Sequence, residues 1–261
     1  MSSEEVRVSN TRPTVGFIYP DHAAESDYPL VARQLDMNFP VVHIYGTDLH
    51  AVPELLDLGS PEKLAEGARL LRPHEPSAVV WACTSGSFVY GPQGAANQVA
   101  LLSESSGTPA SSTSFAFVNA AVALGISKVA VAASYPRDIA ELFVAFLAAH
   151  DIQVVSMGEA GIDTAAEVGR LTASQVDELA DAHDHPDAEA LLIPDTAMHT
   201  VAHVERLESR LDKVVLTANQ VTVWEGLRLI TEPQGRRHPV PEVPVFGLGR
   251  LFRRRHDDAG T

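Results

Sequence analysis

The stretch VAVAASYPRDIAELF, residues 129–143, holds the pattern that decides the fold: an apolar strand ends at Ser-Tyr-Pro and runs directly into a helix. Apolar residues fill the strand and then recur three and four apart, which is typical of a buried strand followed by an amphipathic helix. Residues 15–29, VGFIYPDHAAESDYP, repeat this arrangement near the start of the chain. Further apolar runs alternate with helical segments elsewhere. The sequence therefore predicts an α/β fold with mostly parallel strands.

A second pair of stretches makes the two halves of the chain resemble each other. The first Tyr-Pro is followed by AVVWACTSGS, residues 78–87, and the second by ALLIPDTAMH, residues 190–199. The number of residues between the Tyr-Pro and the following stretch is nearly the same in both halves. If one unit is used twice, Cys83 and Asp195 occupy equivalent places at the carboxyl ends of strands. Ligands of open α/β sheets bind outside those ends. Two such units facing each other would bring Cys83 and Asp195 to opposite sides of one cleft.

The predicted domains follow this duplication. We assign residues 13–117 together with 218–232 to a first α/β unit, and residues 118–217 to a second. Residues 1–12 lack apolar periodicity, and residues 233–261 combine prolines with arginines. We expect both end segments to be extended, solvated tails, and we assign them no function.

Composition excludes several classes of function. The 261 residues carry a formal net charge of −15, which would repel a nucleic-acid backbone. No apolar run approaches the length of a membrane span, and the acidic, polar start does not resemble a secretory signal. One cysteine makes no internal disulfide and fits a reducing compartment. We expect a cytoplasmic protein with no nucleic-acid or membrane partner, in which pairing of exposed helices would give a homo-oligomer.

Neither a cofactor nor a metal is indicated. No glycine-rich phosphate loop of the dinucleotide or P-loop kind is present. HTVAH, residues 199–203, places two histidines four apart, but without a third ligand this is a weak metal pattern. We therefore expect cofactor-independent chemistry without a metal.

Cys83 admits two interpretations. It is followed by Thr84, Ser85 and Gly86 and then by a predicted helix, and such a turn presents backbone N–H groups to an anion. The positive electrostatic potential of these N–H groups also lowers a thiol pKa and favours a nucleophilic thiolate. Free cysteine is, however, among the most buried residue types, and Thr84 and Ser85 could simply cap the helix. On these residues alone, both interpretations stay open.

Asp195 and the tyrosines that end the paired strands are equally ambiguous. Asp195 fits a helix N-cap, and it also fits an acid or base if burial or a nearby anion shifts its pKa. Tyr19 and Tyr135 could each donate to a substrate carboxylate or merely close a strand end. Only a shared cleft with Cys83 would favour catalysis over capping for Asp195.

Six stretches together resemble the aspartate/glutamate racemase superfamily, and most closely its branch of maleate cis-trans isomerases and arylmalonate decarboxylases. The resemblance runs from about Thr14 to Ile230 and preserves motif order. The stretches are TVGFIYP (14–20), WACTSGSFVYG (81–91), TPASSTSFAFVNAAVALGISKVAVAASYP (108–136), AGIDTAAEVGRLT (160–172), LLIPDTAMHT (191–200) and LTANQVTVWEGLRL (216–229).

This resemblance implies two pseudo-symmetric Rossmann-like domains with the active site in the cleft between them. The first of two facing family cysteines falls on Cys83, and the second falls on Asp195, which departs from the pattern. The implied substrate-binding positions are Pro20, Asp21, Thr84, Ser85, Gly86, Tyr135, Thr196 and Ala197. Two asparagines that hold carboxylates in maleate isomerases are also missing, because the matching segments contain Ala23 and Ala165. Maleate itself is therefore not the expected substrate.

The resemblance leads first to a cofactor-independent isomerase, of the maleate isomerase or racemase type, that acts on a small carboxylic acid. Cys83 would act as the thiolate and Asp195 as the opposed acid or base. The alternative is an arylmalonate-decarboxylase-like lyase, which needs one proton donor, although the lone decarboxylase cysteine lies at the position of Asp195. A non-catalytic carboxylate-binding homologue is the third hypothesis.

Overall fold

The computed structural model describes residues 12–20, 23–231 and 247–253. Within them, eight parallel strands form two separate four-stranded sheets, which confirms the predicted α/β class with parallel strands. The first sheet has the order β2-β1-β3-β4 and the second has the order β6-β5-β7-β8. The strands are β1 (Val15–Pro20), β2 (Val41–Ile44), β3 (Ala78–Trp81), β4 (Ala110–Ser112), β5 (Lys128–Ala133), β6 (Gln153–Glu159), β7 (Ala190–Ile193) and β8 (Val214–Thr217).

The two sheets repeat one topology. In the second sheet, β5, β6, β7 and β8 occupy the positions that β1, β2, β3 and β4 occupy in the first. β1 and β5 are the central strands that precede the two Tyr-Pro turns. β3 and β7 lie beside them, paired in parallel, so that Ile18 faces Trp81 and Val131 faces Leu192. The predicted pseudo-symmetric pair of units is thus confirmed, while the residue boundaries of the units stay a prediction.

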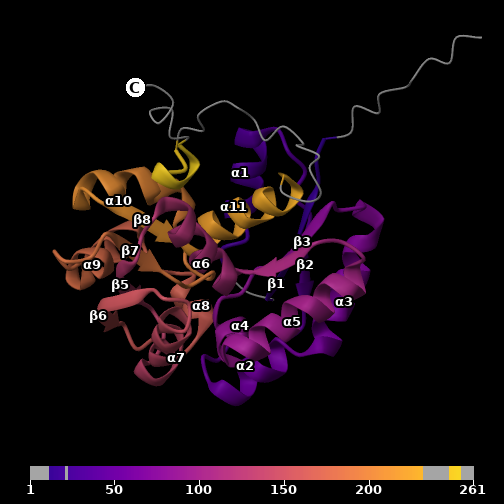
Figure 1. Ribbon diagram of the computed structural model, residues 1–261, viewed down its shortest axis with the longest axis horizontal. Helices are drawn as coiled ribbons and strands as arrows, with labels where there is room; N and C mark the ends of the chain where they lie inside the picture. Colours follow the sequence, from indigo (N-terminus) through magenta and orange to yellow (C-terminus); the bar gives the residue numbers. More distant parts are fainter. Residues whose placement is uncertain (1–11, 21–22, 232–246, 254–261) are drawn as a thin grey trace, which may run out of the picture.

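Helices cover both faces of both sheets (Figure 1). In the first sheet, α1 and α11 pack on one face and α3 and α5 on the other; in the second, α6 and α7 pack on one face and α9 and α10 on the other. The helices are α1 (Asp27–Leu35), α2 (Val52–Leu58), α3 (Pro61–Leu71), α4 (Ser85–Phe88), α5 (Gly91–Ser106), α6 (Thr113–Leu124), α7 (Arg137–Ala148), α8 (Ala165–Val168), α9 (Ala173–His183), α10 (Val204–Leu211) and α11 (Ala218–Thr231), with 3-10 turns at Arg72–His74, Val201–His203 and Arg250–Phe252.

Two helices cross from one unit to the other. α6 follows β4 of the first sheet but packs on the second, and α11 follows β8 of the second sheet but packs on the first. α6 and α11 lie against each other between the sheets (Figure 1). Gly226 of α11 allows that helix to lie close to the first sheet, because a Cβ there would lie 2.5 Å from Cγ1 of Val15 on β1. Because each of these helices packs on the sheet that does not contain the preceding strand, the two units are joined by the chain itself as well as by side-chain packing.

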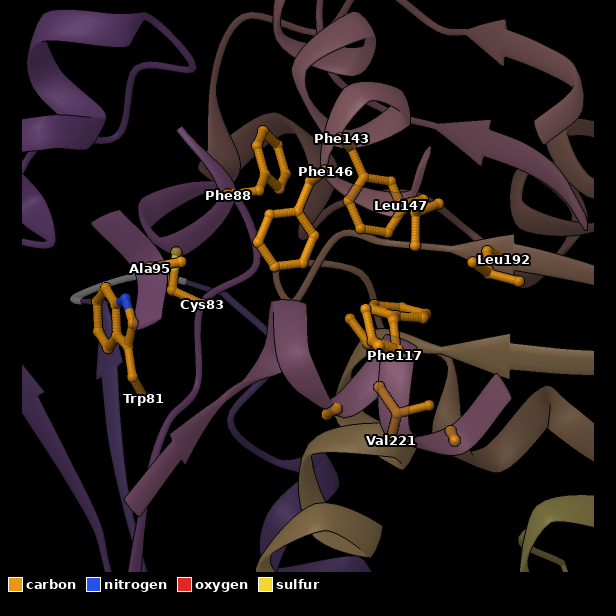
Figure 2. Packing of buried hydrophobic residues seen from close by; sticks show 14 of the residues in the cluster. Trp81, Cys83, Phe88, Ala95, Phe117, Phe143, Phe146, Leu147, Leu192 and Val221 are labelled. Atoms are coloured by element: carbon orange, nitrogen blue, oxygen red, sulfur yellow. The ribbon is translucent and has the colours of Figure 1, made fainter. Parts of the chain in front are cut away.

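One hydrophobic cluster runs through both units. It contains Trp81 of the first sheet and Leu192 of the second, with phenylalanines of α4, α6 and α7 between them. Figure 2 shows the phenylalanine rings lying between Trp81 and Leu192, with Cys83 close to Trp81. The apolar core is therefore continuous from one unit to the other.

Part of the expected C-terminal tail is a docked element, so that prediction was wrong for residues 247–253. Leu248 and Leu251 are buried, and the Leu248 carbonyl accepts a hydrogen bond of 2.7 Å from Gln220. The Arg250 amide donates to both carboxylate oxygens of Glu208, at 3.0 and 2.8 Å. Two apolar anchors and a backbone-to-carboxylate contact therefore hold this short segment on the body of the protein.

Among the described residues, none of the helices combines the length and the apolar content that crossing a bilayer requires.

Candidate active site

Cys83 and Asp195 occupy equivalent positions, each two residues beyond the end of its strand, β3 or β7. Both line one cavity between the units, as the sequence predicted. The cavity is small: its volume of about 30 Å³ leaves room for one or two waters. Its lining consists of Pro20, Thr47, Asp48, Leu49, His50, Leu55, Leu58, Cys83, Ser85, Ala165, Asp195, Thr196 and Ala197.

The Cys83 thiol is buried, with 4% of the residue exposed. The backbone N–H of Gly86 points at Sγ at 3.3 Å, and Ser85 Oγ lies 3.8 Å from it, which is the arrangement expected at the start of α4. Burial nevertheless raises the thiol pKa to about 11, because removing the thiolate from water outweighs these two contacts. Burial therefore opposes the lowering of the thiol pKa by the N–H groups that follow Cys83, and it favours the neutral thiol.

The Asp195 carboxylate is held at both oxygens and is almost fully buried. Oδ1 accepts a hydrogen bond of 2.8 Å from the Ala197 amide, and Oδ2 accepts one from the Ser134 hydroxyl. The Met198 amide donates to the Asp195 carbonyl at 3.2 Å and closes a turn. Asp195 thus caps a turn rather than a helix, and it faces the cavity at the same time.

Tyr135 connects the Cys83 loop to the Asp195 loop. Its hydroxyl donates a hydrogen bond of 2.7 Å to the carbonyl of Pro194, and it lies beside the side chains of Thr84 and Ser85. Burial raises the pKa of this phenol well above its ordinary value. Thr84 Oγ1 is buried and has no hydrogen-bond partner among the described residues. A substrate oxygen that reached this point would find two hydroxyl groups, those of Thr84 and Ser85.

The structure places four of the eight predicted binding residues in the wall of the cavity. Those in its wall are Pro20, Ser85, Thr196 and Ala197, whereas Thr84, Gly86 and Tyr135 lie directly behind it. Asp21 falls outside the described residues. Ala165, where maleate isomerases resembling this chain carry an asparagine, also lines the wall, so the missing amide leaves an apolar surface.

Tyr19, whose role the sequence left open, supports the turn that carries Asp195. Its hydroxyl donates to the Thr196 carbonyl at 2.6 Å and accepts from the Ala24 amide at 2.9 Å. Asn219 of α11 also donates to the Thr196 carbonyl, at 3.1 Å. The peptide group between Thr196 and Ala197 is therefore held from the first unit and from α11 together.

Sequence reasoning missed His50 and Ser134. His50, in the loop between β2 and α2, places Nε2 at 3.9 Å from Asp195 Oδ2. Ser134 is the first residue of the Ser-Tyr-Pro turn and donates to the same oxygen. Ser134 could have been found, because it directly follows the carboxyl end of a predicted strand, whereas His50 stands six residues beyond the end of β2.

Comparison with known proteins agrees with this fold. The sequence model of the arylmalonate decarboxylase family matches residues 58–238. The arylmalonate decarboxylase of Bordetella bronchiseptica is 30% identical over 245 residues, which cover 92% of this chain and 96% of the relative.

Solved structures share the whole fold. A liganded double mutant of arylmalonate decarboxylase, in which cysteine replaces a glycine and serine replaces a cysteine, has a TM-score of 0.78 at 25% identity over 92% of this chain and 98% of its own. A maleate cis-trans isomerase variant from Nocardia farcinica with a covalently bound succinylcysteine intermediate has a TM-score of 0.80 at 21% identity, over the same 92% and 98%. The second likeness concerns the fold alone. The family match and the curated relative together show that this chain belongs to the arylmalonate decarboxylase family.

Proposed function

We propose that the protein is a cofactor-independent decarboxylase that removes one carboxyl group from a malonate bearing an apolar substituent, with Cys83 as the proton donor. The observation that carries this proposal is the neutral, buried thiol at the cavity wall. Such a thiol can give a proton to a carbanion but supplies little thiolate for addition to a double bond. Membership of the arylmalonate decarboxylase family supports the same reaction.

The proposed reaction needs one proton and no other reagent. The carbon–carbon bond to one carboxylate breaks, carbon dioxide leaves, and the bonding electrons form an enediolate on the remaining carboxylate. The Cys83 S–H bond then breaks as the proton passes to the α-carbon, which yields a monocarboxylate and a thiolate. The thiolate regains a proton from water, and its high pKa makes that return favourable.

The cavity wall supports a substrate with one apolar arm. Leu55 and Leu58 of α2 and Leu49 of the preceding loop offer an apolar surface beside the thiol. An apolar surface also favours loss of a carboxylate as neutral carbon dioxide, because the charge of that group is poorly solvated there. Ser85, backed by Thr84 and Tyr135, supplies hydroxyl groups for the carboxylate that remains.

Carbon dioxide release tests the proposal. Phenylmalonate, an alkylmalonate and maleate are each incubated with the protein, and carbon dioxide and the organic product are measured. We expect carbon dioxide and a monocarboxylate from at least one malonate. Isomerisation of maleate without carbon dioxide, or binding of all three without turnover, would contradict the proposed reaction.

An isomerase remains the second candidate, favoured by the placement of Cys83 and Asp195 on the two units around one cavity. Two facing groups suit proton removal on one side and proton delivery on the other. This reaction conserves mass, so the same experiment separates the two candidates. Formation of fumarate from maleate, or racemisation of a chiral carboxylic acid, would favour the isomerase.

A further inference from the structure

His50 is held over the cavity by contacts with the second unit. Its backbone N–H donates to the Asp163 carbonyl at 2.8 Å, and the Ala165 N–H donates to the Asp48 carbonyl at 2.9 Å. Leu49 and Thr164 form an antiparallel bridge between these bonds. The loop between β2 and α2 therefore places His50 of the first unit beside Asp195 of the second. Only 8% of His50 is exposed there.

The contacts of the ring fix which nitrogen faces the cavity. Nδ1 lies 3.1 Å from the Ile162 carbonyl, and because a carbonyl only accepts, Nδ1 carries a hydrogen. The Tyr135 ring packs edge-to-face on the imidazole, with ring centres 4.9 Å apart. Nε2 is left 3.9 Å from Asp195 Oδ2, too far for a hydrogen bond, and it has none to any other described residue. One ring nitrogen of a buried histidine thus lacks a hydrogen-bond partner at the cavity wall.

The charges around the cavity give this nitrogen a function. Asp48 and Asp195 both line the wall, and no lysine or arginine stands among the described lining residues. An anionic substrate would therefore meet negative charge, which is costly in a small cavity with buried walls. His50 is the described lining residue whose side chain can become positive near neutral pH.

We propose that His50, as an imidazolium, binds the substrate carboxylate through Nε2–H, whose nearest carboxylate, Asp195, lies beyond hydrogen-bond distance. The inference rests on the proposed function, because it takes a carboxylate as the substrate. In the decarboxylation, this contact would hold the carboxylate that remains, and it strengthens as negative charge accumulates on the enediolate. His50 thereby supplies the positive partner for the substrate at a cavity wall whose other ionisable groups are acidic or neutral.

The pH dependence of ligand binding isolates His50 from its neighbours. The titratable groups facing it are Asp48, Asp195, Cys83 and Tyr135. Burial raises the pKa values of Cys83 and Tyr135, so both stay neutral between pH 6 and 8. A change of affinity over the window that is present in the wild type and absent from a variant without the imidazole therefore reports on His50.

The test measures binding of phenylacetate, a monocarboxylate that stays ionised throughout the window, by calorimetry at pH 6 and pH 8. We expect the Kd of the wild-type protein to increase about tenfold or more between these pH values, because the imidazolium loses its proton. In His50→Gln, which keeps the backbone bond to Asp163, Kd should change less than about twofold. His74→Gln, at an exposed surface position, is the matched control and should behave like the wild type.

A second variant keeps the inference testable if His50→Gln does not fold. In Asp195→Asn the neighbouring carboxylate is gone, so phenylacetate should bind more tightly than to the wild type at pH 6. No binding to the wild type, or the same pH dependence in His50→Gln, would overturn the inference. Binding with the expected pH dependence, but no carbon dioxide from any malonate, would support the His50 contact and refute only the proposed decarboxylation.

Discussion

The protonation state of Cys83 gives a quantitative prediction for its reaction with iodoacetamide, which attacks thiolates. At pH 8, about one in four ordinary cysteine side chains is ionised, given a pKa near 8.5. With a pKa of about 11, about one Cys83 side chain in a thousand is ionised at that pH. Alkylation of Cys83 should therefore be at least about 200-fold slower than alkylation of a free cysteine derivative.

The assay is mass spectrometry of the alkylated protein at a series of pH values from 7 to 10. Restricted access slows the reaction by a constant factor, whereas a raised pKa makes the rate increase about tenfold per pH unit through pH 10. Free cysteine levels off above about pH 9, and protein unfolded in urea provides the matched control. A rate that levels off at or below pH 9 in the folded protein would refute the neutral-thiol account and favour a thiolate nucleophile.

Further variants test the contacts around the site. The wild type should lose about 2 kcal/mol more stability between pH 9 and pH 11 than Cys83→Ala, because the stabilisation from the raised thiol pKa is lost as the pH rises through the pKa of the folded state; urea titrations at both pH values measure the difference. Asp195→Ala should destabilise the fold by about 1–3 kcal/mol more than Asp195→Asn, since it leaves the Ser134 hydroxyl and the Ala197 amide unpartnered, and equal urea midpoints would contradict this. Tyr135→Phe should cost about 1 kcal/mol through the lost bond to Pro194, measured in the same way.

The repeated topology and the Cys83–Asp195 pair could be predicted because their signals are local. A buried strand that ends in a small or polar residue marks the carboxyl edge of a parallel sheet, and two such edges recur at similar spacing. Parallel pairing in both sheets then places Cys83 and Asp195 alike. Each position follows from the strand that precedes it in the sequence.

The features that could not be predicted depend on contacts between distant segments. The position of His50 results from its pairing with the loop after β6, and no periodicity marks that pairing. The raised pKa of Cys83 comes from burial in the packed core, whereas the sequence shows only the helix that follows the thiol. In the docked C-terminal segment, the anchors Leu248 and Leu251 stand among arginines and prolines that suggest a solvated tail.

The central claim is that the Cys83 thiol delivers the proton that completes decarboxylation. The most direct measurement compares carbon dioxide release from the preferred malonate by the wild type and by Cys83→Ala, after circular dichroism has shown that both are folded. Removing the proton donor should lower kcat by about 10²- to 10⁴-fold, the range of a general acid. Turnover by Cys83→Ala within about threefold of the wild type, well below that range, would contradict the account.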